Sequence, residues 1–385
     1  MSTSSPRQKT WLRVLALGLA VLVLGVLVAA CGGGSSSSSG GSSAPAEESG
    51  SENAEGGTEG AASEEGAEEE EGASNGGEEG ESVEGKTVSL VTCEPNVYCH
   101  AYNENLKTLL GEKGIKVTQL SDNFEPELQN QHMDQAIASK PDLIAVFASN
   151  ADAIVPALVR AKAAGIPTAN LDARLGEEGE EYVDFEIVAD NHELGKFAAE
   201  NLIEGMEKAG YKKGKVIVIT GTMGTLIVED RMEAFEEVMA EHPEFEVEEA
   251  QDGNWDPVET SKIALQLFTK YKSQGGVQGA YGMADYMAGG IIQAAGQLGV
   301  KVGDKPGDTI VTASNCTPTG IPLMEKGELW GNATQSPIVE SEAAAEKIIE
   351  FLEGKEVPHN TTVEEERFTM ENYKKFIPQC AEWPS

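Results

Sequence analysis

The sequence predicts an α/β protein made of two doubly wound parallel-sheet lobes joined by a hinge. From residue 86 onward, apolar segments typical of strands alternate with amphipathic segments typical of helices. This is the order that right-handed crossovers and a covered parallel sheet require. The same order restarts near residue 191. One doubly wound domain seldom needs so many strands, so two similar lobes are the simplest interpretation.

The first lobe is expected to hold five strands. Its pattern places strands at residues 87–92, 115–120, 143–148, 168–171 and 181–187, and helices at residues 101–113, 125–139 and 153–164. Gly165 ends the last of these helices, and Pro167 sets the dihedral that begins the strand ending at Leu171. Asp172 and Arg174 follow that strand. Ligands of open parallel sheets bind at the carboxyl ends of strands, so both are candidate ligand contacts, although a loop ion pair fits equally well.

The second lobe repeats this pattern. Strands are expected at residues 216–220, 245–250, 279–283, 309–314 and 329–335, and helices at residues 191–209, 225–241, 257–271 and 286–298. An amphipathic helix then follows Pro337 and ends at Leu352, before extended chain that reaches Phe368. We assign residues 85–190 and 337–357 to the N-terminal lobe, and residues 191–336 and 358–385 to the C-terminal lobe.

The first 31 residues have the features of a lipoprotein signal peptide. Arg7, Lys9 and Arg13 precede an uncharged apolar run, residues 14–30, which is shorter than a typical membrane span. The run ends in Val-Ala-Ala immediately before Cys31. Small residues before a cysteine resemble the bacterial lipobox, in which that cysteine is lipidated and becomes the mature amino terminus. A cleaved secretory peptide with an incidental cysteine is the alternative.

Residues 32–84 are expected to form a disordered acidic tether. They consist mainly of Gly, Ser, Ala and 15 Glu, with no Lys or Arg, so they cannot bury enough apolar surface to offset the entropy of ordering. The whole chain has a formal net charge of -37, and the part beyond the tether is acidic as well. Nucleic acid is therefore excluded as a partner, because binding it requires a basic surface that neutralises phosphates.

Four cysteines remain once Cys31 is assigned to a lipid: Cys93, Cys99, Cys316 and Cys380. In an exported protein an even number is consistent with two disulfides, and the sequence alone does not choose among the three connectivities. We favour Cys93 with Cys99, because the five intervening residues let a strand end and a turn approach within bonding distance. Metal binding is the rival interpretation, but no CxxC pair or nearby His cluster supports it.

Several short motifs occur in a specific order along the chain. They are the turn Asn96-Val97-Tyr98, the Gly-Ile-Pro strand ending at Asp172, Ala189-Asp190-Asn191 followed by Leu194-Gly195, Gly221 through Arg231-Met-Glu-Ala-Phe235, and Asp285-Tyr-Met-Ala288. With these motifs, the chain from Lys86 nearly to its end resembles the type 1 periplasmic binding proteins. The resemblance is strongest to the ribose-type sugar-binding components of ABC importers.

The resemblance implies a ligand held between the lobes by aromatic rings on its faces and polar side chains around its rim. Carried over position by position, the stacking residues are Tyr98 and Trp255, and the polar residues are Asn96, Asp172, Arg174, Arg231, Asp285, Asn315 and Gln335. An aromatic ring covers the C–H face of a sugar, while Asp and Arg bond its hydroxyls. In this chain, Cys99 replaces a second ring, Ala284 an amide, and Asn315 an Asp of the family pattern.

Each of these residues also has a structural interpretation. Trp255, at a helix start, fits the core equally well, Arg231 fits an ion pair with a neighbouring acidic residue, and Gln335 fits a role in the hinge backbone. An open cleft leaves ligand-binding side chains in water. We therefore expect that replacing Asp172, Arg231 or Trp255 weakens ligand binding and barely changes the stability of the free protein.

Together with the predicted signal peptide and lipidated Cys31, the resemblance implies an extracytoplasmic, lipid-anchored solute-binding protein that captures a small polar ligand for an ABC permease in the membrane. A sugar is the ligand class that it favours. The resemblance also implies closure of the two lobes around the ligand, in a monomer without cofactor or metal. The alternative is a ligand-sensing subunit that presents its closed form to a membrane receptor. An enzyme is disfavoured, because the sequence has no nucleophile elbow, zinc helix or Walker loop; residues 221–224 lack the lysine of a phosphate loop.

Overall fold

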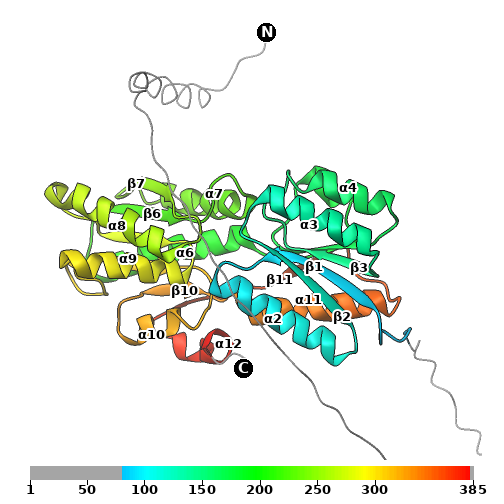
Figure 1. Cartoon of the computed structure of the whole chain (residues 1–385). Coiled ribbons are helices and arrows are strands. Elements are labelled where there is room, and N and C mark those ends of the chain that lie inside the picture. The colour runs from blue at the N-terminus through cyan, green and yellow to red at the C-terminus, as the bar shows by residue number, and fades with distance from the viewer. Residues whose placement is uncertain (1–79, 382–385) are drawn as a thin grey trace, which may run out of the picture. The chain divides into compact units, whose positions relative to one another are not determined.

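The computed structural model describes residues 80–381, which contain two six-stranded sheets (Figure 1). The first sheet has the strand order β11-β5-β4-β3-β1-β2, and the second has the order β12-β10-β9-β8-β6-β7. Neighbouring strands are parallel throughout, except that β12 runs antiparallel to β10. The predicted α/β fold with two parallel-sheet lobes is confirmed.

The first lobe is a sheet covered by helices on both faces. Its strands are β1 (Thr87–Cys93), β2 (Lys116–Asp122), β3 (Leu143–Val146), β4 (Thr168–Asp172), β5 (Phe185–Ala189) and β11 (Asn360–Val363). Helices α2 (Val97–Glu112) and α11 (Pro337–Leu352) cover one face, α3 (Pro126–Ser139) and α4 (Val155–Ala163) cover the other, and α5 (Glu177–Glu180) is a single turn before β5 (Figure 1). Successive side chains point to opposite faces, so Leu90 packs with α2 and Val91 packs with α3.

The second lobe has the same arrangement. Its strands are β6 (Gly214–Thr220), β7 (Phe245–Asp252), β8 (Gly279–Gly282), β9 (Ile310–Ala313), β10 (Gly331–Ala333) and β12 (Arg367–Thr369). Its helices are the packed pairs α6 (Asn191–Lys208) with α7 (Leu226–Ala240) and α8 (Pro257–Tyr271) with α9 (Asp285–Leu298), followed by α10 (Gly320–Glu325) and α12 (Ile377–Ala381). Two short 3-10 turns, η1 (Lys272–Gln274) and η2 (Tyr373–Phe376), complete it.

Two of these helices begin at a capping aspartate. The side chains of Asp190 and Asp256 accept hydrogen bonds from backbone N–H groups in the first turns of α6 and α8.

The chain passes between the two sheets three times, after β5, after β10 and between β11 and β12. The second and third crossings are bonded to each other: the N–H of Thr334 donates to the carbonyl of Glu366 (3.0 Å), and the N–H of Glu366 donates to the hydroxyl of Thr334 (2.7 Å). These three segments form the hinge between the lobes.

One predicted lobe boundary is wrong. The sequence assigned residues 358–385 to the C-terminal lobe, but β11 pairs in parallel with β5 and so belongs to the first sheet. The physical reason is the free edge of β5, which an added strand satisfies with backbone hydrogen bonds. Only the chain after residue 363 reaches the second sheet, through β12.

The predicted tether extends too far along the chain. Residues 80–84 pack on the first lobe: Val83 is buried in its core, and the N–H of Glu81 donates to the carbonyl of Glu353 at 2.9 Å. One apolar residue, Val83, hardly changes the amino-acid composition from which the tether was predicted. Its burial nevertheless contributes to the packing of this segment on the lobe. The predicted signal peptide, Cys31 and residues 32–79 lie outside the described residues. Within residues 80–381, no helix combines the length and hydropathy that crossing a membrane requires.

Two disulfides hold the loops that follow β1 and β9. Cys93 pairs with Cys99, which is the pairing that the sequence favoured, and Cys316 pairs with Cys380. The first ties the end of β1 to the first turn of α2. The second ties the loop after β9 to α12, so the C-terminal segment is fixed to the carboxyl end of the second sheet.

Candidate functional site

The carboxyl ends of the two sheets meet at one small buried cavity. Its walls are Asn96, Tyr98, Cys99, Phe124, Phe147 and Asp172 from the first lobe, and Ile227, Arg231, Trp255, Tyr286, Asn315 and Gln335 from the second lobe and the hinge. The space between them is about 30 Å³. Small-molecule sites usually measure several hundred Å³, so the lobes have to part before a ligand can enter.

Arg231, on α7, is the centre of the polar side of the cavity. Its guanidinium is buried and donates to the side chains of Asn191 (2.9 Å), Asn315 (3.2 Å) and Gln335 (2.6 Å), and to the carbonyl of Met283 (2.9 Å). Asn191 and Gln335 stand in two different hinge crossings. Arg231 therefore joins the hinge to the ends of the second sheet, and it presents a fixed positive charge to the cavity.

Trp255 supplies the aromatic wall of the second lobe. Its ring lies directly against Gly221, where an added Cβ would stand 1.9 Å from the Cε2 atom of the indole. The guanidinium of Arg231 lies 5.6 Å from the ring centroid, within cation–π range. Only a glycine at the end of β6 leaves room for this ring, so the Gly221 motif has a steric explanation.

Three further aromatic residues line the cavity that the sequence did not single out: Phe124, Phe147 and Tyr286. Phe124 follows the end of β2, and Phe147 follows the end of β3. The rule that identified Asp172, that residues after parallel strands face the ligand, depends on the strand ends. The strand predicted at residues 143–148 includes Phe147, and the one predicted at residues 115–120 ends four residues before Phe124, whereas β3 ends at Val146 and β2 at Asp122.

Backbone strain is concentrated around this cavity. Six non-glycine residues among those described have positive φ, and four of them line the cavity: Phe124 (59°), Asp172 (69°), Trp255 (56°) and Asn315 (68°). A bulky residue such as Phe or Trp in this region is an outlier that costs on the order of 1–3 kcal/mol. Such strain persists where the surrounding fold holds side chains in one direction, as at binding sites.

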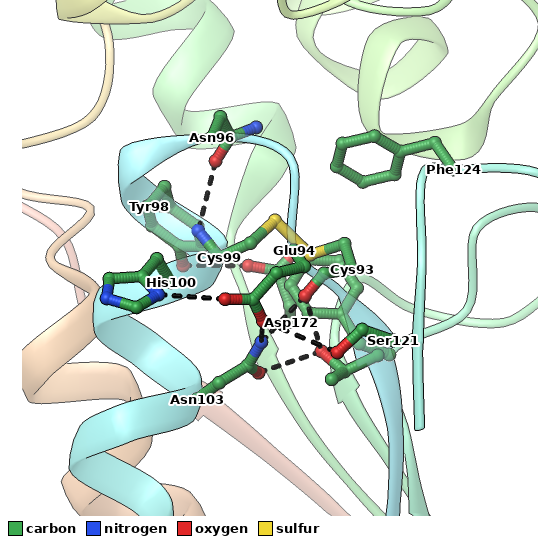
Figure 2. Close-up of a disulfide and its surroundings, with 12 residues drawn as sticks. Cys93, Glu94, Asn96, Tyr98, Cys99, His100, Asn103, Ser121, Phe124 and Asp172 are labelled. Atoms are coloured by element: carbon green, nitrogen blue, oxygen red, sulfur yellow. Dashed lines mark hydrogen bonds and ion pairs between the residues drawn. A yellow bond between two sulfur atoms is a disulfide. The ribbon is translucent and has the colours of Figure 1, made fainter. Parts of the chain in front are cut away.

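Asp172, at the end of β4, belongs to a hydrogen-bonded chain that leads away from the cavity. The hydroxyl of Tyr98 lies 2.8 Å from its Oδ1 (Figure 2) and 2.6 Å from Oε2 of Glu340, which is on α11 behind the cavity. The side-chain N–H of Gln335 reaches the same Asp172 oxygen at 3.5 Å. Burial raises the pKa of Asp172 above its ordinary value, while the bond from Tyr98 and the charge of Arg231 oppose this shift.

The turn at Asn96 is held by local bonds (Figure 2). The side-chain oxygen of Asn96 accepts from the N–H of Cys99 at 3.0 Å and so caps α2, and the disulfide to Cys93 lies directly beneath the turn. Tyr98 follows in this turn, with its ring stacked against Tyr102. The predicted stacking role of Tyr98 is therefore limited, since its ring faces the core and its hydroxyl is already bonded.

Two predicted polar contacts do not line the cavity. Arg174 reaches across the lobes to Asp230 of α7 in a two-bond ion pair (2.8 and 2.7 Å), which leaves its side chain half exposed. Asp285 is buried beneath the site and accepts from the N–H (2.8 Å) and hydroxyl (2.7 Å) of Thr317 and from the N–H of Gly320. Burial raises its pKa to about 7. Arg174 forms an ion pair between the lobes, and Asp285 accepts hydrogen bonds from the loop after β9.

The expectation that the site residues stand in water is also wrong. Asp172, Arg231 and Trp255 are 3%, 1% and 9% exposed, because the lobes lie closed on each other and the polar groups bond among themselves. Replacing any of them has to change the stability of the free protein as well as its affinity for a ligand.

Two other features of the second lobe are weaker candidates. A hollow of about 540 Å³ lies near the amino-terminal ends of the strands, and charged residues such as Lys208 and Glu371, which pair with each other, line it. Within residues 80–381, one group of side chains could hold a metal ion, Glu207, His242 and Glu244, and none of these lines the interlobe cavity. Neither feature has the strained backbone and convergent buried groups of the interlobe cavity.

Comparison with known proteins agrees with this geometry. Residues 88–356 match the family model of the periplasmic binding protein domain. The chain belongs to this family. The two sheets and three crossings of this periplasmic binding protein form the two-lobed fold of type 1, and its relatives are binding proteins, so the chain is not an enzyme.

The similar proteins cover most of the described residues. The D-apiose import binding protein of Actinobacillus succinogenes is 26% identical over 232 residues, which are 59% of this periplasmic binding protein and 73% of the relative. The ribose import binding protein RbsB of Escherichia coli strain K12 is 26% identical over 244 residues, 63% of this chain and 77% of the relative. The crystal structure of a galactofuranose binding protein matches with a TM-score of 0.72 and 19% identity, over 77% of this chain and 99% of that one.

Proposed function

We propose that this periplasmic binding protein captures a sugar or a related polyol outside the cytoplasm and delivers it to the permease of an ABC importer. The observation that carries the proposal is the interlobe cavity, to which each lobe contributes aromatic and polar side chains. A ligand in this cavity bonds to both lobes at once. It therefore stabilises the closed arrangement relative to the open one, which is how such a protein signals its loaded state.

The chemistry of the walls favours a neutral, hydroxyl-rich ligand. Trp255 and Phe124 offer flat apolar faces for C–H groups, while Asp172, Arg231 and Asn315 offer a carboxylate, a guanidinium and an amide for hydroxyl groups. The relatives point to the same class, since their names specify apiose, ribose, galactofuranose and xylitol.

A thermal-shift screen of the purified protein tests this proposal. The panel contains pentoses, hexoses, polyols, nucleosides and amino acids, each at a high and equal concentration. A ligand that binds only the folded protein, at about 100 times its Kd, adds about 2.7 kcal/mol of stability. We expect at least one sugar or polyol to raise the melting temperature. A shift caused by amino acids or nucleosides alone would contradict the proposed ligand class.

We also propose that a lipid on Cys31 anchors the protein to the outer face of the membrane, and that residues 32–79 act as its tether. Replacing Cys31 with Ser is expected to move the protein from the membrane fraction to the soluble fraction of the cells that express it, because the thiol is the acceptor of the lipid. Ser35→Ala, in the same segment, is the matched control and should stay with the membrane. Membrane retention of the Cys31 variant would count against the anchor.

A further inference from the structure

Two buried carboxyl groups, of Asp172 and Glu340, lie within hydrogen-bond distance of one buried phenol oxygen, that of Tyr98. The hydroxyl of Tyr98, on α2, is 2.8 Å from Oδ1 of Asp172 at the end of β4 and 2.6 Å from Oε2 of Glu340 in the first turn of α11. The three residues are 4%, 3% and 2% exposed. Asp172 lines the cavity and Glu340 does not, so Glu340 lies behind the wall of the site.

The number of protons in this group follows from the two distances. A phenol has a single O–H, so Tyr98 can donate to only one of the two carboxyls. The other contact is a hydrogen bond only if its carboxyl carries a proton and donates to the phenol oxygen. Two ionised carboxylates across one buried oxygen would instead leave lone pairs facing each other in a region of low dielectric constant. The closed structure thus requires one protonated carboxyl.

The surroundings place this proton on Glu340. Asp172 has the guanidinium of Arg231, on α7, as a nearby positive charge, which favours its ionised form. The charged neighbours of Glu340 are both acidic: Asp172, on β4, and Glu365, in the crossing between β11 and β12. The second oxygen of Glu340, Oε1, has no hydrogen-bond partner among the described residues. Burial and these negative charges raise the pKa of Glu340 well above its ordinary value.

We propose that Glu340 is a positioning residue of the ligand site: as a protonated acid it donates to Tyr98, which donates to Asp172 and holds this carboxylate toward the cavity. The role in ligand binding rests on the proposed function; the protonation of Glu340 does not. Oδ1 of Asp172 accepts from Tyr98 and Gln335, and the carboxyl of Asp172 also lies in hydrogen-bond contact with that of Glu340. These contacts fix the direction of the carboxylate that lines the cavity.

A dependence on pH follows, with a definite sign. The pKa of Glu340 is raised in the closed protein, so its contribution is complete below the ordinary pKa of 4.5 and is lost as the pH rises through the raised value. Glu365, whose pKa burial raises to about 8 and which also lies near Asp190, shifts stability in the same direction. The variant Glu340→Gln separates the pH-dependent contribution of Glu340 from that of Glu365. The amide of the variant still donates to Tyr98 but does not titrate, whereas Glu365 is unchanged.

The protonation is tested on the ligand-free protein by infrared difference spectroscopy near neutral pH. The spectrum of the parent minus that of Glu340→Gln is expected to show the C=O stretching band of a protonated carboxyl. The matched control is Glu342→Gln, an exposed position two residues along the same helix, which should give no such band. A difference spectrum of parent and Glu340→Gln without the band overturns the proposal, whether or not any ligand is ever found.

The positioning role is tested with D-ribose, D-apiose, D-galactose and xylitol, using the compound that raises the melting temperature of the parent most. The parent affinity is expected to fall as the pH rises from mildly acidic to mildly alkaline, because Glu340, whose pKa is raised in the closed protein, then loses the proton that it donates to Tyr98. Glu340→Gln should match the parent near pH 6 and lose most of this fall, whereas Glu340→Ala should bind weakly throughout. Identical pH profiles for the parent and Glu340→Gln would overturn the proposal.

Discussion

Replacing Arg231 with Met is expected to lower the free energy of unfolding by at least about 3 kcal/mol. The guanidinium donates to three side chains and one backbone carbonyl, all buried. Methionine fills a similar length but donates nothing, so Asn191, Met283 and Asn315 lose a donor in a place that water does not reach. Each buried acceptor left without a partner costs about 1–3 kcal/mol. Chemical denaturation of the ligand-free variant measures the loss.

The matched control is Arg160→Met. Arg160 pairs with Asp134 on the surface, and its side chain is 44% exposed. Exposed ion pairs contribute about 1 kcal/mol or less, so this variant should stay close to the parent. Equal stabilities for the two variants would show that the network around Arg231 contributes nothing beyond an ordinary surface pair, and the structural role given to Arg231 would be wrong.

Removing the disulfide between Cys316 and Cys380 is expected to cost about 4 kcal/mol of stability. The bond joins residues 64 apart in the sequence, and a crosslink that closes a long loop restricts the unfolded chain more than one that closes a short loop. The double variant Cys316→Ser with Cys380→Ser also frees α12 from the loop that holds Asn315, so its affinity for a ligand should fall as well.

The second disulfide provides the comparison. Cys93 and Cys99 are only six residues apart, which gives about 2 kcal/mol by the same chain-entropy relation. Urea denaturation of the two double variants, without reductant, ranks the two bonds. If removal of the short-loop bond costs as much as removal of the long-loop bond, the entropy of the unfolded chain does not account for the stabilisation by these disulfides.

Most of the fold could be predicted because its signals are local. Proline at the first helical position and a regular apolar period predicted α8 to the residue, at Pro257–Tyr271, and α11, at Pro337–Leu352, to within one residue at its start. The strand β5 was predicted to begin four residues and to end two residues too early, because the acidic residues before it have no strong preference and form the turn α5. The strand β11 was assigned to the wrong lobe, since only the free edge of a distant strand decides its place.

The candidate site could be predicted in part. Asp172 ends β4, Asn315 follows β9 and Gln335 follows β10, and these positions at the carboxyl ends of strands bring them to the cavity. The role of Glu340 could not be predicted from the sequence, because Glu340 lies 242 residues from Tyr98 in the chain. Only the packing of α11 on α2 brings the two side chains together. Arg174 has the right place in the chain but pairs with Asp230, a partner that only the approach of the two lobes supplies.

The central claim, that a small hydroxylated ligand binds between the lobes against Trp255, is tested most directly by calorimetry with the compound selected in the thermal-shift screen. The parent is compared with Trp255→Ala, with Gly221→Ala, whose added Cβ has to displace the same ring, and with Val258→Ala as an exposed control. Unfolding of each variant is measured in parallel, so that affinity refers to folded protein.

We expect Trp255→Ala to lose about 1 to 3 kcal/mol of binding free energy through the lost aromatic face, with a loss of the same direction for Gly221→Ala and none for Val258→Ala. Folded Trp255→Ala and Gly221→Ala proteins that bind the compound with the parent affinity would contradict the account, and they would place the ligand outside the interlobe cavity.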